Sequence, residues 1–183
     1  GQNRGGGDDR DLGVALHDRA LGKRHSRDGL VAVDGDGCRQ GRKRGDGTAH
    51  YRAYDRTWDV AVPGKATIHC SNDPLLGGDP GKMNPEDLLL SALSACHMLW
   101  YLHYASDAGI MVTGYEDSPI GRGEVGPGGA GRFVHATLRP RITVAEGTDL
   151  AAAEAIHHRI HKVCFIARSV NFPVDYAPEF VLS

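Results

Sequence analysis

Cys96, in the run NPEDLLLSALSACHMLWYLH, is a residue whose side chain could act as a nucleophile. A cysteine reacts as its thiolate, so a neighbouring group must lower the pKa of the thiol. The run predicts a helix, and Cys96 lies about three turns into it, beyond the first turn where the helix dipole acts. The activating group must therefore be a side chain from elsewhere. The alternative is an inert thiol packed in the core, where unpaired cysteines are common.

Glu86 precedes Cys96 on the same predicted helix and is a carboxylate that could serve the same site. At about 1.5 Å of rise per residue, the axial gap between the two is roughly 15 Å. Glu86 would therefore act through a bridging residue or reach the thiol of a partner chain. Equally, it could only stabilise the helix N-terminus, where acidic side chains are favourable.

A second cysteine, Cys164, follows His157 and His161 in the run HHRIHKVCFIARS. The spacing i, i+4, i+7 predicts that the three side chains share one helix face. They could be three ligands of a zinc ion, with water or a partner residue as the fourth. The alternative is a polar helix face with one half-buried thiol. The sequence holds no GxSxG, HExxH or P-loop motif.

The helix that carries Cys96 has clear signals at both ends. Asn84 is a good N-cap and Pro85 suits the first helical position, so we expect a helix from Pro85 to about Ala108, ending at Gly109. It is apolar on nearly every face, which predicts burial all round. A chain this small cannot easily bury such a helix alone, so the pattern favours a dimer whose partner covers one side.

The remaining elements predict an α+β protein with mainly antiparallel strands. The glycine-rich GRGEVGPGGAG contains a literal GxGxxG, but a proline follows instead of a helix, so we expect a hairpin loop there. A second helix is expected from Asp149 to about Ala167, capped by Thr148. The expected strands are Ala49–Tyr54, Thr57–Val62, Ala66–His69, Ile110–Ser118, Phe133–Val144 and an edge strand, Phe172–Leu182.

Composition excludes several classes of function. The 183 residues carry a net charge of −2, which argues against a nucleic-acid or membrane-surface binder. No signal peptide or membrane span is recognisable, and the four cysteines are dispersed without a CxxC pair, which is typical of thiols in the cytoplasm. Residues 1–47 are rich in Gly, Arg and Asp and poor in apolar residues, so we expect a flexible extension there and one folded domain over residues 48–183.

The run NPEDLLLSALSACHMLWYLHYASDAGI, together with VCFIARSVNFPVDY, resembles the OsmC/Ohr family of organic hydroperoxide reductases. The resemblance covers about residues 47–183. It implies an α+β, OsmC-like intertwined homodimer in which antiparallel sheets wrap around two long central helices, with the active sites at the subunit interface. It also implies a peroxidase without a metal or nucleotide cofactor.

By this resemblance, Cys96 is the peroxidatic thiol, which becomes a sulfenic acid, and Cys164 is the resolving thiol, which forms a disulfide with it. An external dithiol, with a lipoylated protein as the family's precedent, reduces the disulfide. Glu86 matches the carboxylate that holds an arginine against the thiolate.

The sequence departs from the family pattern at that arginine. The segment before NPE, SNDPLLGGDPGKMN, holds no arginine and only Lys82. Arg52 and Arg56 are then the nearest candidates, with exposed strand charges as the alternative for both. Two other functions stay open: a non-catalytic dimeric module that binds a hydrophobic ligand, and a zinc-binding protein that uses His157, His161 and Cys164.

Overall fold

The computed structural model describes residues 47–183 and three short strand segments before them. The chain divides into two compact units, Gly1–His69 and Cys70–Ser183, and each is described by itself. Apart from Gly47 and these strand segments, the extension expected over residues 1–47 lies outside the described residues. Neither helix of residues 47–183 has the length and hydrophobicity needed to span a bilayer.

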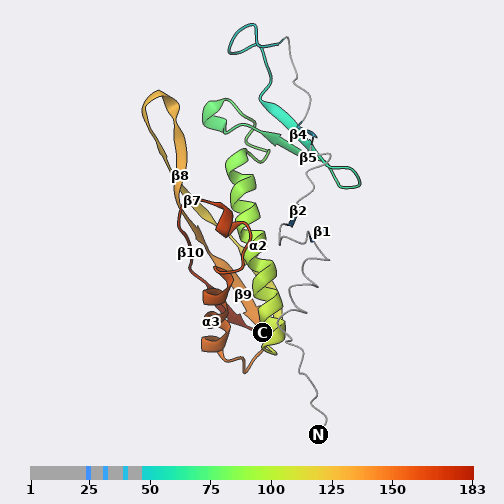
Figure 1. The fold of residues 1–183 in the computed structure, drawn as a ribbon, viewed down its shortest axis with the longest axis vertical. Coiled ribbons are helices and arrows are strands. Elements are labelled where there is room, and N and C mark those ends of the chain that lie inside the picture. Colours follow the sequence, from blue (N-terminus) through green and yellow to red (C-terminus); the bar gives the residue numbers. More distant parts are fainter. Residues whose placement is uncertain (1–23, 26–30, 33–38, 41–46) are drawn as a thin grey trace. The chain divides into compact units, whose positions relative to one another are not determined.

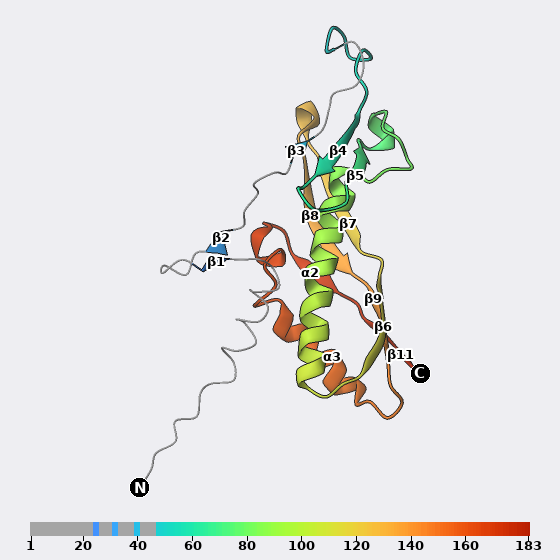
Figure 2. The same ribbon diagram turned by 90° about the vertical axis from the view of Figure 1, so that its right-hand side faces the viewer.

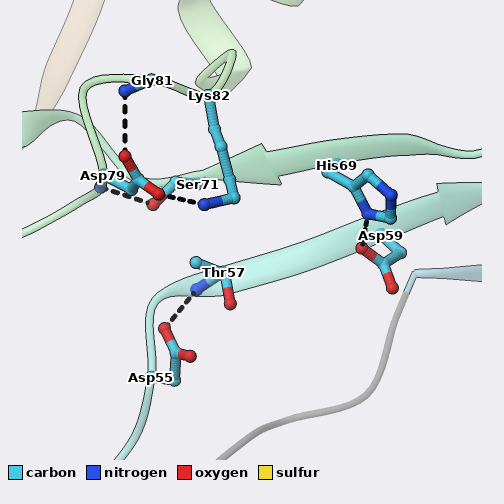
Figure 3. A network of polar contacts seen from close by, with 8 residues as sticks. All are labelled: Asp55, Thr57, Asp59, His69, Ser71, Asp79, Gly81 and Lys82. Atoms are coloured by element: carbon cyan, nitrogen blue, oxygen red, sulfur yellow. Dashed lines mark hydrogen bonds and ion pairs between the residues drawn. The ribbon is translucent and has the colours of Figure 1, made fainter.

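The first unit contains short antiparallel pairings. β1 (Arg24–His25) pairs with β2 (Val31–Ala32), and β3 (Arg39–Gln40) pairs with β4 (Thr57–Ala61). β4 lies between β3 and β5 (Ile68–Ser71), the strand in which this unit ends. Asp59 contacts His69 across 2.6 Å, and Asp55 accepts a hydrogen bond from the backbone of Thr57 (Figure 3). The strand expected over Thr57–Val62 is thus confirmed, and the one over Ala66–His69 begins two residues later.

The strand expected over Ala49–Tyr54 is wrong. This segment forms bends and a turn, in which the N–H of Ala53 donates to the carbonyl of His50 at 3.0 Å. The guanidinium of Arg56 lies over the rings of Tyr51 and Tyr54, at 4.4 and 4.9 Å from their centroids. The aromatic residues therefore fold back around one cation instead of alternating across a sheet.

The second unit begins with a tightly bonded loop before the long helix. The N–H of Ser71 donates to the carbonyl of Met83, and the hydroxyl of Ser71 accepts from the N–H of Asp79 at 2.8 Å. The carboxylate of Asp79 accepts from Gly81 and pairs with Lys82 (Figure 3). The bond with Lys82 and that with Gly81 lower the pKa of Asp79. Lys82 is thus held inside its own loop.

The helix α2 (Pro85–Asp107) confirms the expected start and end. Asn84 and Asp87 form a reciprocal capping box, with the N–H of Asp87 donating to Asn84 at 2.7 Å. At the C-terminal end, the N–H of Ile110 donates to the carbonyl of Ala105, and Gly109 adopts a positive φ of 70° that glycine tolerates without strain.

Only one face of α2 is buried in the single chain, so the expectation of burial all round is not met there. The buried residues follow the spacing of one helix face: Leu93, His97, Trp100, Tyr101 and Ala105. On the other side, Leu99 is 47% exposed. The apolar side chain of Leu99 is therefore left partly uncovered.

Two three-stranded sheets complete this unit, and α2 runs beside them (Figures 1 and 2). In one, β8 (Gly131–Leu138) lies between antiparallel β7 (Ile120–Val125) and parallel β10 (Val174–Tyr176). In the other, β9 (Pro140–Val144) lies between antiparallel β6 (Val112–Asp117) and parallel β11 (Glu179–Leu182). The mixed helix-and-sheet class predicted from the sequence is confirmed.

Three expected boundaries in this part of the chain are wrong. The glycine-rich stretch is not only a loop, because its first half forms β7; a Cβ on Gly121 would lie 2.3 Å from the ring of Phe133 and 3.1 Å from Leu90. Glycine there permits close packing of strand on helix. The expected strand Phe133–Val144 divides at Arg139, whose N–H donates to Asp117 at 2.7 Å. The closing strand divides into the two edge strands β10 and β11 around Pro178.

The second helix, α3 (Leu150–Ile160), is shorter than expected. Its N-cap is Asp149 and not Thr148: the carboxylate of Asp149 accepts from the N–H groups of Ala151 and Ala152. After Ile160 the chain continues in turns to a short 3₁₀ segment, Ala167–Ser169. In Figure 1, α3 lies beside the C-terminal half of α2, and the hydroxyl of Tyr101 donates to the carbonyl of Ala153 at 3.3 Å.

Candidate active site

Two thiols from distant parts of the chain meet in the second unit. The Sγ atoms of Cys96 and Cys164 lie 3.0 Å apart, although the residues are 68 positions apart in the sequence. Both are thiols and neither is in a disulfide. Cys164 is 1% exposed, whereas Cys96 is only partly buried. The pair is therefore asymmetric, with one sulfur enclosed and the other nearer to the surface.

Cys164 reaches this position because α3 ends early. The N–H of Cys164 donates to the carbonyl of Ile160 at 2.8 Å, which closes the last turn and directs the side chain into the core. The sulfur of Cys164 also accepts from the N–H of Ala167 at 3.5 Å. The helix is therefore shorter than expected and Cys164 lies beyond it, but the side chains of His157, His161 and Cys164 do face one side, because all three line the same cavity.

Of the two thiols, Cys164 holds its proton more tightly. Its thiol donates to the sulfur of Cys96, and this bond together with burial raises the pKa of Cys164 well above its usual range. The same bond favours negative charge on the acceptor, Cys96. A disulfide requires a distance of about 2.05 Å, so the two sulfurs need to approach by only about 1 Å to form one.

Beside the thiols lies a buried pair of histidines. Nε2 of His97 and Nδ1 of His157 are 2.8 Å apart, and the side chains are 6% and 0% exposed. Burial lowers the pKa of His97 to about 4. Burial, with smaller effects from His97 and His158, lowers the pKa of His157 to about 3. Both rings are therefore neutral at pH 7.

The ring of His157 is enclosed by aromatic side chains. It lies 4.7 Å from the ring of Tyr101 and 4.9 Å from that of Tyr176, centroid to centroid. From the sequence, His157 was expected only as a possible zinc ligand, and its pairing with His97 was not predicted. The burial of His97 could have been predicted from the sequence, because His97 shares the helical spacing of the buried residues Leu93 and Trp100.

A small cavity adjoins both pairs. Its volume is about 10 Å³. Its polar lining comes from Cys164 and from the side chains of α2, α3, the α3 C-cap and β10: His97, His157, His161, Asp175 and Tyr176. The thiol of Cys164 thus has Cys96 as one neighbour and, as another, a cavity lined by both apolar and polar side chains.

The residues proposed as zinc ligands do not form a metal site. Within residues 47–183, no three or more His, Cys, Asp or Glu side chains are grouped so that they could hold a metal ion. Nδ1 of His157 is bonded to His97 and the sulfur of Cys164 contacts Cys96, so two of the three potential ligands already have another neighbour.

The charged candidates come from the start of α2 and from the first unit. Glu86 is exposed at the second position of α2, ten residues before Cys96 in the numbering. Arg52 and Arg56 belong to the first unit. Arg52 is exposed, and Nη2 of Arg56 donates to the carbonyl of Tyr51 at 2.9 Å. Their suggested roles stay predictions.

Residues 77–178, more than half of the chain, match the family model described as OsmC-like protein. The chain belongs to the OsmC-like family. The resemblance inferred from the sequence is thereby confirmed, as is the OsmC-like α+β fold of the single chain, whereas the homodimer stays a prediction. A search of curated proteins gives no match.

Solved structures support the same fold for this OsmC-like protein. It is similar to an OsmC-like protein of unknown function from Vibrio cholerae, with 28% identity and a TM-score of 0.63 over 68% of this chain and 85% of that one. An organic hydroperoxide resistance protein OsmC from Legionella pneumophila is 20% identical, with a TM-score of 0.55 over 78% and 96% of the two chains. One from Elizabethkingia anophelis is 17% identical, with a TM-score of 0.55 over 79% and 96%.

Proposed function

We propose that this OsmC-like protein is a cysteine-based peroxidase that reduces organic hydroperoxides to alcohols. The observation that carries the proposal is the contact of 3.0 Å between a partly buried and a fully buried thiol. Structural relatives named as organic hydroperoxide resistance proteins support the class of substrate. Cysteines that must cycle between thiol and disulfide suit a reducing compartment, so we place this antioxidant activity in the cytoplasm.

In the first step, the thiolate of Cys96 attacks the distal oxygen of the hydroperoxide. The S–O bond forms, the O–O bond breaks, and the alkoxide leaves and takes up a proton to become the alcohol. Cys96 is thereby oxidised to a sulfenic acid. The hydrogen bond from Cys164 supports this role, because a donor directed at a sulfur stabilises its negative charge.

In the second step, the thiol of Cys164 condenses with the sulfenic acid. The S–S bond forms, the S–O bond of Cys96 breaks, and the proton of Cys164 leaves with the hydroxide as water. An external dithiol then reduces the disulfide by two thiol–disulfide exchanges and becomes oxidised itself. A lipoylated protein is the physiological reductant that we propose.

We further propose that the protein acts as a homodimer. The exposed, apolar side of α2, on which Leu99 is 47% exposed, supports this because a second copy of the helix would cover it. In this assembly Glu86 holds the guanidinium of Arg56 or Arg52 against the thiolate of Cys96, in the same or the second copy. A guanidinium suits this role because it stays charged and binds a carboxylate through two donors.

The decisive experiment follows consumption of cumene hydroperoxide, with hydrogen peroxide in parallel and dihydrolipoamide or dithiothreitol as reductant. We expect turnover of the organic peroxide by the wild type and none by Cys96→Ser. Cys38→Ser is the matched control and should leave turnover unchanged. Retained activity in Cys96→Ser would rule out the mechanism.

The competing function is a non-catalytic dimeric module in which Cys96 is only a packed thiol. It would show no peroxide turnover and slow alkylation of Cys96 near neutral pH, because a protonated thiol is a poor nucleophile. The peroxidase proposal requires the opposite result in both assays.

A further inference from the structure

The two thiols and the two imidazoles connect the same segments. Cys96 and His97 are consecutive on α2, whereas His157 lies near the end of α3 and Cys164 in the turns that follow it. The sulfurs are 3.0 Å apart and the bonded ring nitrogens 2.8 Å apart. The mechanism proposed above uses the first contact only.

His157 has a ring nitrogen to spare. Its Nε2 is buried and has no hydrogen-bond partner among the described residues. A buried polar atom without a partner is unfavourable, and ordered water is a common solution. The adjoining cavity of about 10 Å³ has the smallest size that holds one water. His157 and Cys164 both line it.

We propose that His157 and His97, through a water in this cavity, relay the proton that Cys164 releases when the Cys96–Cys164 disulfide forms. The proposal rests on the proposed peroxidase function. Cys164 passes its proton to the water, and the water passes one to Nε2 of His157. The Nδ1 proton of His157 moves to Nε2 of His97. His97, which directly follows Cys96 on α2, gives its own Nδ1 proton to the hydroxide that leaves Cys96. The products are the disulfide and water.

The two rings are suited to move a proton without storing charge. Burial keeps both histidines neutral, so an imidazolium is not a stable intermediate in either position. In the relay each ring exchanges one tautomer for the other and stays neutral. The hydrogen bond between the rings is kept, with donor and acceptor exchanged. The starting tautomer places a lone pair, and not an N–H, on the unpartnered Nε2 of His157.

The test separates the two chemical steps in a rapid-quench experiment with reduced full-length protein and cumene hydroperoxide. Dimedone traps the sulfenic acid, and alkylation followed by mass spectrometry measures the disulfide. In His157→Gln, which keeps an amide in place of the ring but cannot exchange tautomers, we expect unchanged sulfenic-acid formation and disulfide formation slowed at least about tenfold. The matched control is His103→Gln, which replaces a histidine of α2 outside the cavity lining.

A purely structural role for His157 would give a different result. In that case His157→Gln would form the disulfide as fast as the wild type does. The disulfide step of the wild type would also be equally fast in D₂O and H₂O. Either finding overturns the relay. If His157→Gln does not fold, as judged by circular dichroism, His97→Gln is measured in its place with the same expectation.

Failure of the peroxidase function can be distinguished from failure of the relay by dithiodipyridine. This reagent converts Cys96 to a mixed disulfide with release of one thiopyridone, and Cys164 then resolves that disulfide with release of a second thiopyridone, without peroxide; the rate of the second release is compared. Slower release in His157→Gln, in a protein that does not consume peroxide, would support the relay while rejecting the peroxidase. Equal release in both proteins would overturn the relay.

Discussion

The thiol of Cys164 donates its hydrogen to the sulfur of Cys96 across 3.0 Å, which gives the two cysteines unequal roles. The donor keeps its proton because burial and this bond raise its pKa. The acceptor is partly buried and is the better placed of the two to meet a substrate. One contact therefore favours a thiolate at Cys96 and holds the second thiol ready for disulfide formation.

Replacing Cys164 with serine should separate oxidation from resolution. Cys96 should still react once with cumene hydroperoxide, because its own sulfur is the nucleophile, but no disulfide can follow. We expect the sulfenic acid to persist in Cys164→Ser, where dimedone added after the reaction still gives an adduct by mass spectrometry, whereas in the wild type it has by then been converted to the disulfide. A disulfide from Cys96 to Cys38 or Cys70 in the wild type would contradict the resolving role of Cys164.

The position of Cys96 could be predicted from the sequence because it depends on local signals. Asn84 and Asp87 cap α2, and Gly109 ends it, as expected from residue types alone. The position of Cys164 depends instead on where α3 stops. No proline or glycine marks that end, and tertiary packing of the turn after Ile160 decides it. The periodic pattern of apolar residues therefore predicted an end near Ala167, beyond the observed end of α3 at Ile160.

The strands show the same limit. Tyr51 and Tyr54 fit an alternating pattern, but their rings pack around Arg56 and no strand forms. Glycines lower strand propensity, yet Gly121 lies in β7. Glycine is needed at this position because any side chain would collide with Phe133. Such contacts join residues that are close only in the folded chain, so the local sequence does not report them.

Stability should fall with acid because of the buried histidines. Folded His97 and His157 have pKa values of about 4 and about 3, compared with 6.5 in an unfolded chain. As pH falls below 6.5 the unfolded state binds protons that the folded state does not, so the free energy of unfolding decreases until the folded pKa values are reached. Each histidine contributes a slope of up to about 1.4 kcal/mol per pH unit, measurable by urea unfolding between pH 7 and pH 4.

The control for this slope is the exposed neighbour His158. His158→Gln should keep the acid dependence, whereas His157→Gln should reduce it, because glutamine does not titrate. An unchanged slope in His157→Gln would show that His157 is already protonated in the folded protein at pH 5.

The exposed side of α2 should mediate association. Leu99 is 47% exposed on a helix that is otherwise rich in apolar residues, and a charge at this position would be costly to bury against a second copy. We expect the wild type to sediment as a dimer of the 19.6 kDa chain and Leu99→Glu to sediment mainly as a monomer. Leu75→Glu, at a leucine that is 95% exposed, is the matched control and should stay dimeric. A monomeric wild type would refute the dimer.

An arginine that activates Cys96 should be identified by the pH dependence of its alkylation. A nearby guanidinium stabilises the thiolate, and each 1.4 kcal/mol of that stabilisation lowers the pKa of a thiol by about one unit. In the variant that removes the activating residue, Arg56→Met or Arg52→Met, we expect the alkylation profile of Cys96 to move at least about one unit to higher pH. The rate of peroxide reduction at pH 7 should fall with it.

Two further variants separate this effect from loss of structure. Lysine retains the charge but not the paired donors, so lysine at the same position should restore only part of the rate. Glu86→Gln should reproduce part of the shift if Glu86 orients the guanidinium, although it adds no positive charge of its own. If all these profiles coincide with that of the wild type, neither Arg52 nor Arg56 takes the place of the arginine that is missing before NPE. The thiol of Cys164, through its hydrogen bond, is then the main group that stabilises the Cys96 thiolate.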